Sequence, residues 1–324
     1  MEVRERPQDW QEFAAQFRQI ERNVEKVVRG KDAEIRLALV ALVAEGHLLI
    51  EDVPGVGKTM LAKAMARSID CSFRRLQFTP DLLPTDVTGV NVFNQEQRDF
   101  EFKPGAIFAN IVLGDEINRA SPKTQSALLE CMEERQVTID TETHPLGTPF
   151  MVIATQNPIE HEGTYPLPEA QLDRFMLRLS IGYPSADIEA EILASHASGG
   201  PLDDIGPVTD APGVARMIEQ ARQVHVAPAI RRYIVNLVEA TRNHGDIYLG
   251  ASPRASLMIL RASRAFAAAA ERDFVIPDDV KSLAISALAH RIIVSADAVM
   301  SGRSPSVVLK EILGEVAVPV AENP

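Results

Sequence analysis

The side chains with the clearest chemical potential are a lysine and a threonine that follow two closely spaced glycines. Gly55 and Gly57 can bring successive backbone N–H groups close to the oxygens of a phosphate. Lys58 is then placed to reach the β- and γ-phosphates of a nucleotide, and the Thr59 hydroxyl is placed to bind Mg²⁺. The usual form of this loop, the Walker A motif, begins with glycine, whereas this chain has Asp52 there. A nucleotide-binding loop is still the better interpretation than a chance glycine-rich turn.

Two further apolar runs end in polar side chains that suit the same chemistry. Asp115 and Glu116 end the run 109–116, and Asn157 follows the run 150–155. The carboxyl ends of parallel strands meet at one edge of a sheet, so these side chains should lie near the phosphate loop. Asp115 would then orient Mg²⁺ through its water shell, Glu116 would activate the attacking water, and Asn157 would position that water. A cap on the following turn is an equally simple role for Asn157.

The elements that must position these residues are predicted from apolar periodicity. Buried strands are expected at residues 48–51, 73–78, 109–116, 150–155 and 176–181. Helices are expected at residues 10–28, at 32–44 with Asp32 as the N-cap, at 60–67 and at 123–135. Strands that alternate with helices predict an α/β domain built on a parallel sheet.

Two segments alternate in hydrophobicity on either side of a polar tip, which predicts hairpins. The first, at residues 90–102 with its tip at 94–99, is expected to interrupt a helix that starts near residue 79 and resumes after residue 104. An ordinary surface loop is the alternative for this segment. The second hairpin is expected at residues 137–146.

From the Tyr183-Pro184 pair onward the pattern is helical. Helices are expected at 187–195, 213–223, 228–244, 253–270, 277–290 and 305–316, with a loop at 199–204. We therefore predict two domains: an N-terminal helix with a nucleotide-binding core in residues 1–184, and an all-helical domain in residues 185–324.

Composition narrows the functional classes. The chain has 324 residues, 46% of them apolar, and a net charge of −12, which disfavours a sequence-independent grip on nucleic acid. The cysteines, Cys71 and Cys131, fit small buried hydrophobes better than a disulfide. The ligand spacing favours no metal site other than Mg²⁺. No apolar run of 18 residues occurs and the N-terminus is charged, so a cytoplasmic protein with no transmembrane segment is expected.

Taken in order, these motifs resemble the MoxR family of AAA+ ATPases over residues 24–318. The resemblance is carried by the segments 51–59, 77–84, 115–120, 154–158 and 162–175. In that family Asp at position 52 is familiar. The resemblance implies an AAA+ P-loop core with a helix-2 insert hairpin and a pre-sensor hairpin, followed by an all-α lid. It also implies a ring, usually a hexamer, with ATP at the subunit interfaces.

The resemblance also implies roles for individual residues. Asp115 and Glu116 become the Walker B pair, Asn157 becomes sensor 1, and ATP with Mg²⁺ is the expected cofactor. The nucleotide is expected to contact Pro54, Gly55, Val56, Gly57, Lys58, Thr59, Met60, Asp115 and Arg254. Adenine is expected between core and lid, near Val27, Val28 and Gly30 and under Tyr183-Pro184.

Two arginines are implied to act on the γ-phosphate. Arg174 resembles the arginine finger, which reaches the nucleotide of a neighbouring subunit, although Arg119 is a rival and a surface ion pair is the simpler alternative. Arg254 resembles sensor 2 at the start of a lid helix. A solvated residue is its alternative, although a cation in a first helical turn is mildly unfavourable.

The function implied by the resemblance is ATP-driven, chaperone-like remodelling, assembly or metal and cofactor insertion in client proteins. Partners with von Willebrand factor A domains are typical of the family. The polar hairpin tips lack the aromatic pair of threading unfoldases and, with the charge, disfavour a DNA translocase. A transcription activator would need an insert tip and a helix-turn-helix that are not visible. A magnesium-chelatase-like ATPase motor subunit is the nearest alternative.

Overall fold

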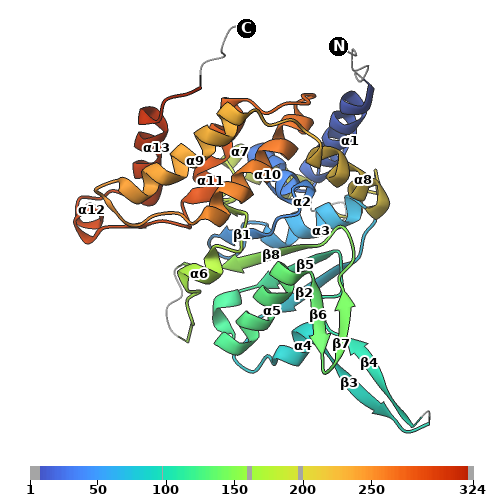
Figure 1. Cartoon of the computed structure of the whole chain (residues 1–324). Helices are drawn as coiled ribbons and strands as arrows, with labels where there is room; N and C mark the ends of the chain where they lie inside the picture. The colour runs from blue at the N-terminus through green and yellow to red at the C-terminus, as the bar shows by residue number, and fades with distance from the viewer. Residues whose placement is uncertain (1–7, 97, 159–162, 196–199, 320–324) are drawn as a thin grey trace.

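The core of the molecule is a five-stranded parallel sheet (Figure 1). The computed structural model describes residues 8–96, 98–158, 163–195 and 200–319, so Gln97, Glu162 and Gly199 of the predicted segments lie outside it. The sheet order is β2-β5-β8-β1-β9. The strands are β1 (Leu48–Glu51), β2 (Phe73–Gln77), β5 (Ile111–Asp115), β8 (Met151–Gln156) and β9 (Leu177–Leu179). All the strands predicted for the core are therefore present.

Helices cover both faces of this sheet, which is why its central strands are continuously apolar. Ile50 and Ile153 face a core shared with α1 (Gln8–Glu25), α2 (Asp32–Val43) and α3 (Lys58–Ser68). Leu49 and Val152 face the opposite core, which includes α5 (Pro122–Glu134). The predicted N-cap of α2 is wrong: Lys31 holds that position, and Asp32 is the first residue of the helix.

Both predicted hairpins are present and lie on the same side of the molecule (Figure 1). The first joins β3 (Gly89–Asn94) to β4 (Asp99–Pro104), and the second joins β6 (Gln136–Ile139) to β7 (Glu142–Pro145). The first hairpin follows a five-residue helix, α4 (Pro84–Thr88), and residues 105–110 form turns. The helix predicted to resume after residue 104 is thus not formed, because Gly105 packs against the backbone of Val87 and Gly89.

The C-terminal part is helical, as predicted, and packs on α1 and α2. Its helices are α7 (Ala186–Ser195), α8 (Ala211–Arg222), α9 (Pro228–Asn243), α10 (Pro253–Ala269), α11 (Pro277–Leu288), α12 (Ala296–Met300) and α13 (Pro305–Glu315). Two short strands that the periodicity did not predict, β10 (Ile247–Leu249) and β11 (Ile293–Val294), pair antiparallel. One apolar core runs from the sheet through α2 into α10 and α11, so the lid is not an isolated unit.

Short elements connect these layers. A 3₁₀ turn, η1 (Ile117–Arg119), follows β5, and α6 (Glu169–Leu172) precedes β9. Among the described residues, no helix combines the length and apolar character needed to span a bilayer.

Candidate nucleotide-binding site

The segment between β1 and α3 has the backbone of an anion-binding loop. Gly55 and Gly57 have φ values of 86° and 96°, which side-chain-bearing residues rarely adopt. Gly57 is the N-cap of α3 and Lys58 is its first residue, and no side chain caps the helix. The first N–H groups of α3, with the positive end of its dipole, therefore face the space above the loop.

That space is a cavity of about 390 Å³ at the carboxyl edge of the sheet. It brings together the predicted residues of three separate strand ends. Its lining consists of Pro54, Gly55, Gly57, Lys58, Thr59, Met60, Arg75, Gln77, Asp115, Glu116 and Asn157. Lys58 Nζ donates to the Asp52 carbonyl at 2.7 Å, which places its ammonium over the loop.

The two carboxylates at the end of β5 are held by neighbouring strands. Thr155 Oγ1 donates to Asp115 Oδ1 at 2.7 Å and accepts from the Glu116 N–H at 2.9 Å. Gln77 Nε2 donates to Glu116 Oε2 at 2.9 Å. Glu116 itself has a φ of 58°, a left-handed conformation that costs a residue of this type about 1 kcal/mol or more. The strand therefore ends by turning the Glu116 side chain toward the phosphate cavity.

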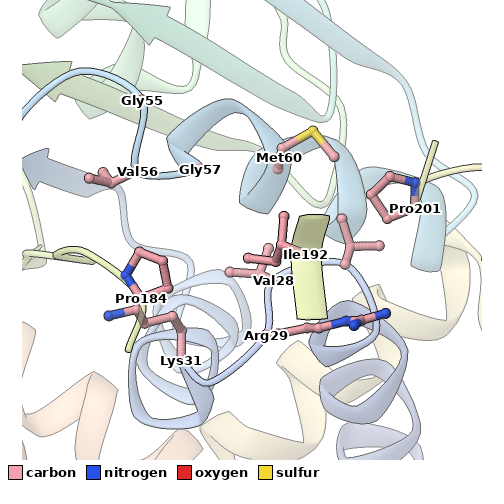
Figure 2. Close-up of a pocket in the computed structure, with 11 residues that line it drawn as sticks. Val28, Arg29, Lys31, Gly55, Val56, Gly57, Met60, Pro184, Ile192 and Pro201 are labelled. Carbon is pink, nitrogen blue, oxygen red and sulfur yellow. The ribbon is translucent and has the colours of Figure 1, made fainter. Parts of the chain in front are cut away.

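A second cavity of about 250 Å³ lies on the other side of the loop and is mostly apolar (Figure 2). Gly55, Gly57 and Met60 line both cavities, so the two are adjacent. The other lining residues are Val27, Val28, Arg29, Lys31, Val56, Pro184, Ile192 and Pro201. An apolar pocket next to a phosphate loop suits a flat purine base.

The residues predicted around adenine are only partly those that line this cavity. Val27, Val28 and Pro184 line it, whereas Gly30 and Tyr183 do not, and Arg29 and Lys31, the neighbours of Gly30, line it instead. The Tyr183 side chain is 74% exposed, and its carbonyl accepts from Lys31 Nζ at 3.0 Å. Of the predicted Tyr183-Pro184 pair, Pro184 is therefore the residue that lines the cavity.

Arg174 and Arg254 lie together in a third cavity of about 220 Å³. Both pair with Glu133: Arg174 Nη2 lies 3.3 Å from Glu133 Oε2, and Arg254 pairs with the other oxygen. Glu45, Gly46 and His47 of this cavity directly precede β1, and Arg174 precedes β9. The cavity therefore lies at the amino edge of the sheet, opposite the phosphate loop.

The length of β1 gives the approximate distance between these two edges of the sheet. A four-residue strand such as β1 spans about 13 Å, so the two cavities open at edges roughly that far apart. Arg119, the rival finger, lies instead beside its own chain's site, with Nη1 3.1 Å from Glu116 Oε2.

Comparisons with known proteins agree with this geometry. Residues 47–177 match the family described as "ATPase family associated with various cellular activities (AAA)", and residues 239–312 match the AAA lid domain. The protein YeaC of Bacillus subtilis is 48% identical over 93% of this chain and 94% of its own length. The chaperone MoxR1 of Mycobacterium tuberculosis is 42% identical over 95% of this chain and 84% of its own length.

The chain belongs to the MoxR family of AAA+ ATPases. A crystal structure of a candidate ATPase from Cytophaga hutchinsonii has the same fold, with a TM-score of 0.89 and 38% identity over 96% of this chain and 97% of the other. As a member of this family the protein hydrolyses ATP.

Three residues of this MoxR-family site were missed by reasoning from the sequence: Arg75, Gln77 and Thr155. Arg75 and Gln77 are two residues apart on β2, so their side chains lie on the same face of the strand. β2 pairs with β5, and Gln77 lies opposite Asp115. Thr155 is the last fully buried residue of β8. The sequence signal that could have identified these residues is a polar side chain near the carboxyl end of a buried strand.

The cysteines of this MoxR-family chain contribute no chemistry to the site. Both are free thiols, and burial raises the pKa of each to about 12. They are thus protonated and unreactive at neutral pH, as expected for small buried hydrophobes.

Proposed function

We propose that this protein assembles into a ring, in the hexameric form usual for AAA+ proteins, and hydrolyses ATP between neighbouring subunits. The observation that carries the proposal is the position of Arg174 and Arg254. Both belong to a cavity at the amino edge of the sheet, whereas the phosphate loop opens at the carboxyl edge. Two arginines on a surface remote from their own site are suited to the γ-phosphate bound by the next subunit.

Within one subunit, the predicted residues bind the nucleotide or act on the attacking water. Lys58 and the N-terminal N–H groups of α3 bind the β- and γ-phosphates, and Glu116 takes the proton of the attacking water. Asn157 lines the same cavity and positions that water. The adenine base occupies the apolar cavity beside Val28 and Met60.

The residues present also fit a magnesium ion. Thr59 and Asp115 line one cavity and offer a hydroxyl and a carboxylate oxygen, the donor types that Mg²⁺ prefers. When bound there, Mg²⁺ would neutralise the charge that develops on the phosphate oxygens.

The work done by hydrolysis is proposed to be chaperone-like remodelling of client proteins, including assembly or cofactor insertion. The chaperone MoxR1 is among the relatives, which supports this class of function. The first hairpin offers a contact surface: its tip is polar, but the cross-strand pair Phe93 and Phe100 is 52% and 67% exposed. A partner with a von Willebrand factor A domain would couple the ring to its client.

Mixed rings test the interface proposal. Arg174→Ala subunits keep their own Glu116, and Glu116→Gln subunits keep Arg174, so each homogeneous ring should be slow. Loss of a finger arginine costs roughly 10³ to 10⁵ in turnover. Mixing the two should restore part of the ATPase rate if Arg174 acts on the neighbouring subunit. Absence of recovery in rings shown to contain both subunits would contradict the proposal.

The same design separates the two candidate fingers. Arg119 lies beside Glu116 of its own chain, so Arg119→Ala mixed with Glu116→Gln should not recover activity. Recovery with Arg119→Ala and not with Arg174→Ala would assign the finger to Arg119.

Client capture tests the remodelling proposal. Full-length Glu116→Gln protein held in ATP should retain nucleotide and therefore trap its partners, which mass spectrometry can identify. A von Willebrand factor A protein or an immature metalloenzyme, absent when Lys58→Ala is used, is the expected result. Enrichment of nucleic acid or polymerase subunits would overturn the proposal.

A further inference from the structure

The phosphate cavity contains an arginine with no part in the predicted chemistry. Arg75 reaches from β2 to the carboxylate at the end of β5, where its Nε and Nη2 both donate to one oxygen. Arg75 Nη2 lies 2.7 Å from Asp115 Oδ2, and Nε lies 3.2 Å from the same atom. This places a positive charge on the carboxylate that fits magnesium.

Both oxygens of Asp115 are therefore engaged, but by different kinds of partner. Oδ1 accepts from the buried hydroxyl of Thr155, which is fixed within β8. Oδ2 is held only by the Arg75 guanidinium among the contacts that the described residues show. The Arg75 side chain is 49% exposed, so it can rotate into solvent without unpacking the core.

Arg75 also connects the two carboxylates of the site. Its Nη2 donates to Gln77 Oε1 at 2.9 Å, and Gln77 Nε2 donates to Glu116 Oε2 at 2.9 Å. The side chains of Asp115 and Glu116 thus lie at the two ends of one hydrogen-bonded chain. Movement of the guanidinium would release Gln77 at the same time.

We propose that Arg75 is an internal cation that competes with magnesium for Asp115. The guanidinium neutralises Asp115 while the site holds no metal, and it leaves Oδ2 when a metal–nucleotide complex binds. This inference rests on the magnesium site proposed above, at Thr59 and Asp115. Arg75 acts through Asp115, so it is a positioning residue that sets how strongly nucleotide binding depends on magnesium.

The measurement is the metal coupling of nucleotide binding. The dissociation constant of a fluorescent, non-hydrolysable ATP analogue is determined in EDTA and in saturating Mg²⁺. The coupling is the constant in EDTA divided by the constant in Mg²⁺. Arg75→Gln should raise this ratio about fivefold, the upper end for a partly exposed ion pair. Arg75→Lys, which keeps the charge, should stay near the wild-type ratio.

Two further proteins serve as controls. Arg74→Gln removes a charge from the adjacent residue, which alternates to the opposite face of β2, and should leave the ratio unchanged. Asp115→Asn added to Arg75→Gln should abolish the gain, because the contested carboxylate is then absent. Thermal unfolding of each variant verifies that it is folded.

The outcomes are distinct. A ratio near one in both the wild type and Arg75→Gln would overturn the magnesium site itself. A wild-type ratio well above one would make Arg75 an ordinary surface ion pair if Arg75→Gln changes neither this ratio nor either dissociation constant. An equal rise in both dissociation constants of Arg75→Gln would instead make Arg75 a phosphate ligand, and this too would overturn the competition.

Discussion

The carboxylate of Asp52 accepts a hydrogen bond of 2.6 Å from the backbone N–H of Gly182. This contact joins the start of the phosphate loop to the connection between β9 and the helical lid. Asp52 is only 8% exposed and also accepts from Ser180 Oγ at 3.1 Å and from the Val53 N–H at 3.0 Å. The position where the Walker A motif usually has glycine therefore carries a carboxylate that ties the loop to the lid connection.

Asp52→Ala should destabilise the protein and loosen the loop. It leaves the Gly182 N–H without its acceptor at a partly buried position, which costs about 1–3 kcal/mol. Chemical denaturation should show this loss, and affinity for an ATP analogue should fall with it. Ser180→Ala removes only the hydroxyl and should cost about 1 kcal/mol or less. An Asp52→Ala protein with wild-type stability and affinity would show that the contact has no role.

Thr155→Val should impair turnover more than binding. The variant keeps the shape of the side chain but removes the hydroxyl that orients Asp115 and accepts from the Glu116 N–H. Loss of groups that orient metal-binding residues typically costs about 10- to 100-fold in activity. Steady-state ATPase rates should fall by that factor, while Thr155→Ser should retain most activity. An equal fall for valine and serine would point to packing instead.

The core of the site could be predicted from sequence because its residues are fixed by strand ends. Lys58 and Thr59 follow β1, Asp115 ends β5 and Asn157 follows β8. In a parallel sheet these ends share one edge, so apolar runs and the polar residues after them were enough. The longer helices of the lid were predictable from their amphipathic patterns, whereas α12, with five residues, is too short to show one and was not predicted.

The remaining features depend on pairing between distant segments. Arg75 faces Asp115 only because β2 lies next to β5, and apolar periodicity does not order the strands of a sheet. Arg254 meets Arg174 because both pair with Glu133 of α5, a contact between three separate segments. The strands β10 and β11 are too short to show a period in the sequence.

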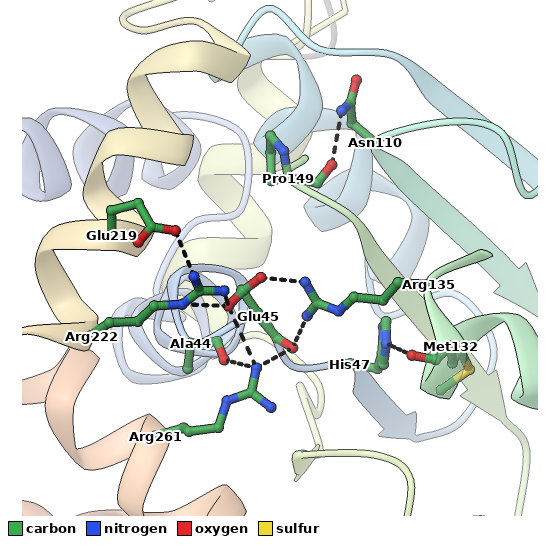
Figure 3. A network of polar contacts seen from close by, with 10 residues as sticks. All are labelled: Ala44, Glu45, His47, Asn110, Met132, Arg135, Pro149, Glu219, Arg222 and Arg261. Atoms are coloured by element: carbon green, nitrogen blue, oxygen red, sulfur yellow. Dashed lines mark hydrogen bonds and ion pairs between the residues drawn. The ribbon is translucent and has the colours of Figure 1, made fainter. Parts of the chain in front are cut away.

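Glu45→Gln should weaken the junction between core and lid. Glu45 lies between α2 and β1, and its carboxylate pairs with Arg135 of the core and Arg222 of α8, with Arg261 of α10 at 3.9 Å (Figure 3). Because the arginines are partly exposed, we expect a loss of about 2 kcal/mol in unfolding free energy at pH 7. Glu219→Gln, which removes only an exposed partner of Arg222, should cost about 0.5 kcal/mol or less.

The effect of Glu45→Gln should also depend on pH. Burial alone would raise the pKa of Glu45, but Arg135 and Arg222 outweigh it and lower this pKa below its usual value. The carboxylate therefore contributes its stability above the ordinary glutamate pKa and loses it as the pH falls through the lowered one. The difference between wild type and variant, measured by denaturation, should shrink from pH 7 to pH 3. A constant difference would assign the effect to packing.

His47→Gln should remove part of the acid sensitivity of the protein. His47 is buried, its Nδ1 accepts from the Val152 N–H at 3.0 Å, and its Nε2 donates to the Met132 carbonyl at 2.9 Å. Both ring nitrogens are thus engaged in the neutral form. Burial lowers the pKa of His47 to about 3, and Arg135 and Arg261 act in the same direction.

The direction of the pH effect follows from this lowered pKa. The unfolded chain binds a proton at His47 below about pH 6.5, whereas the folded chain does not until about pH 3. His47 should therefore lower the unfolding free energy of the wild type by about 1.4 kcal/mol for each unit that the pH falls between pH 6 and pH 4. Burial also lowers the pKa of His290, so the quantity to compare is the difference in slope between wild type and His47→Gln. Identical slopes would mean that the folded protein accommodates a charged His47.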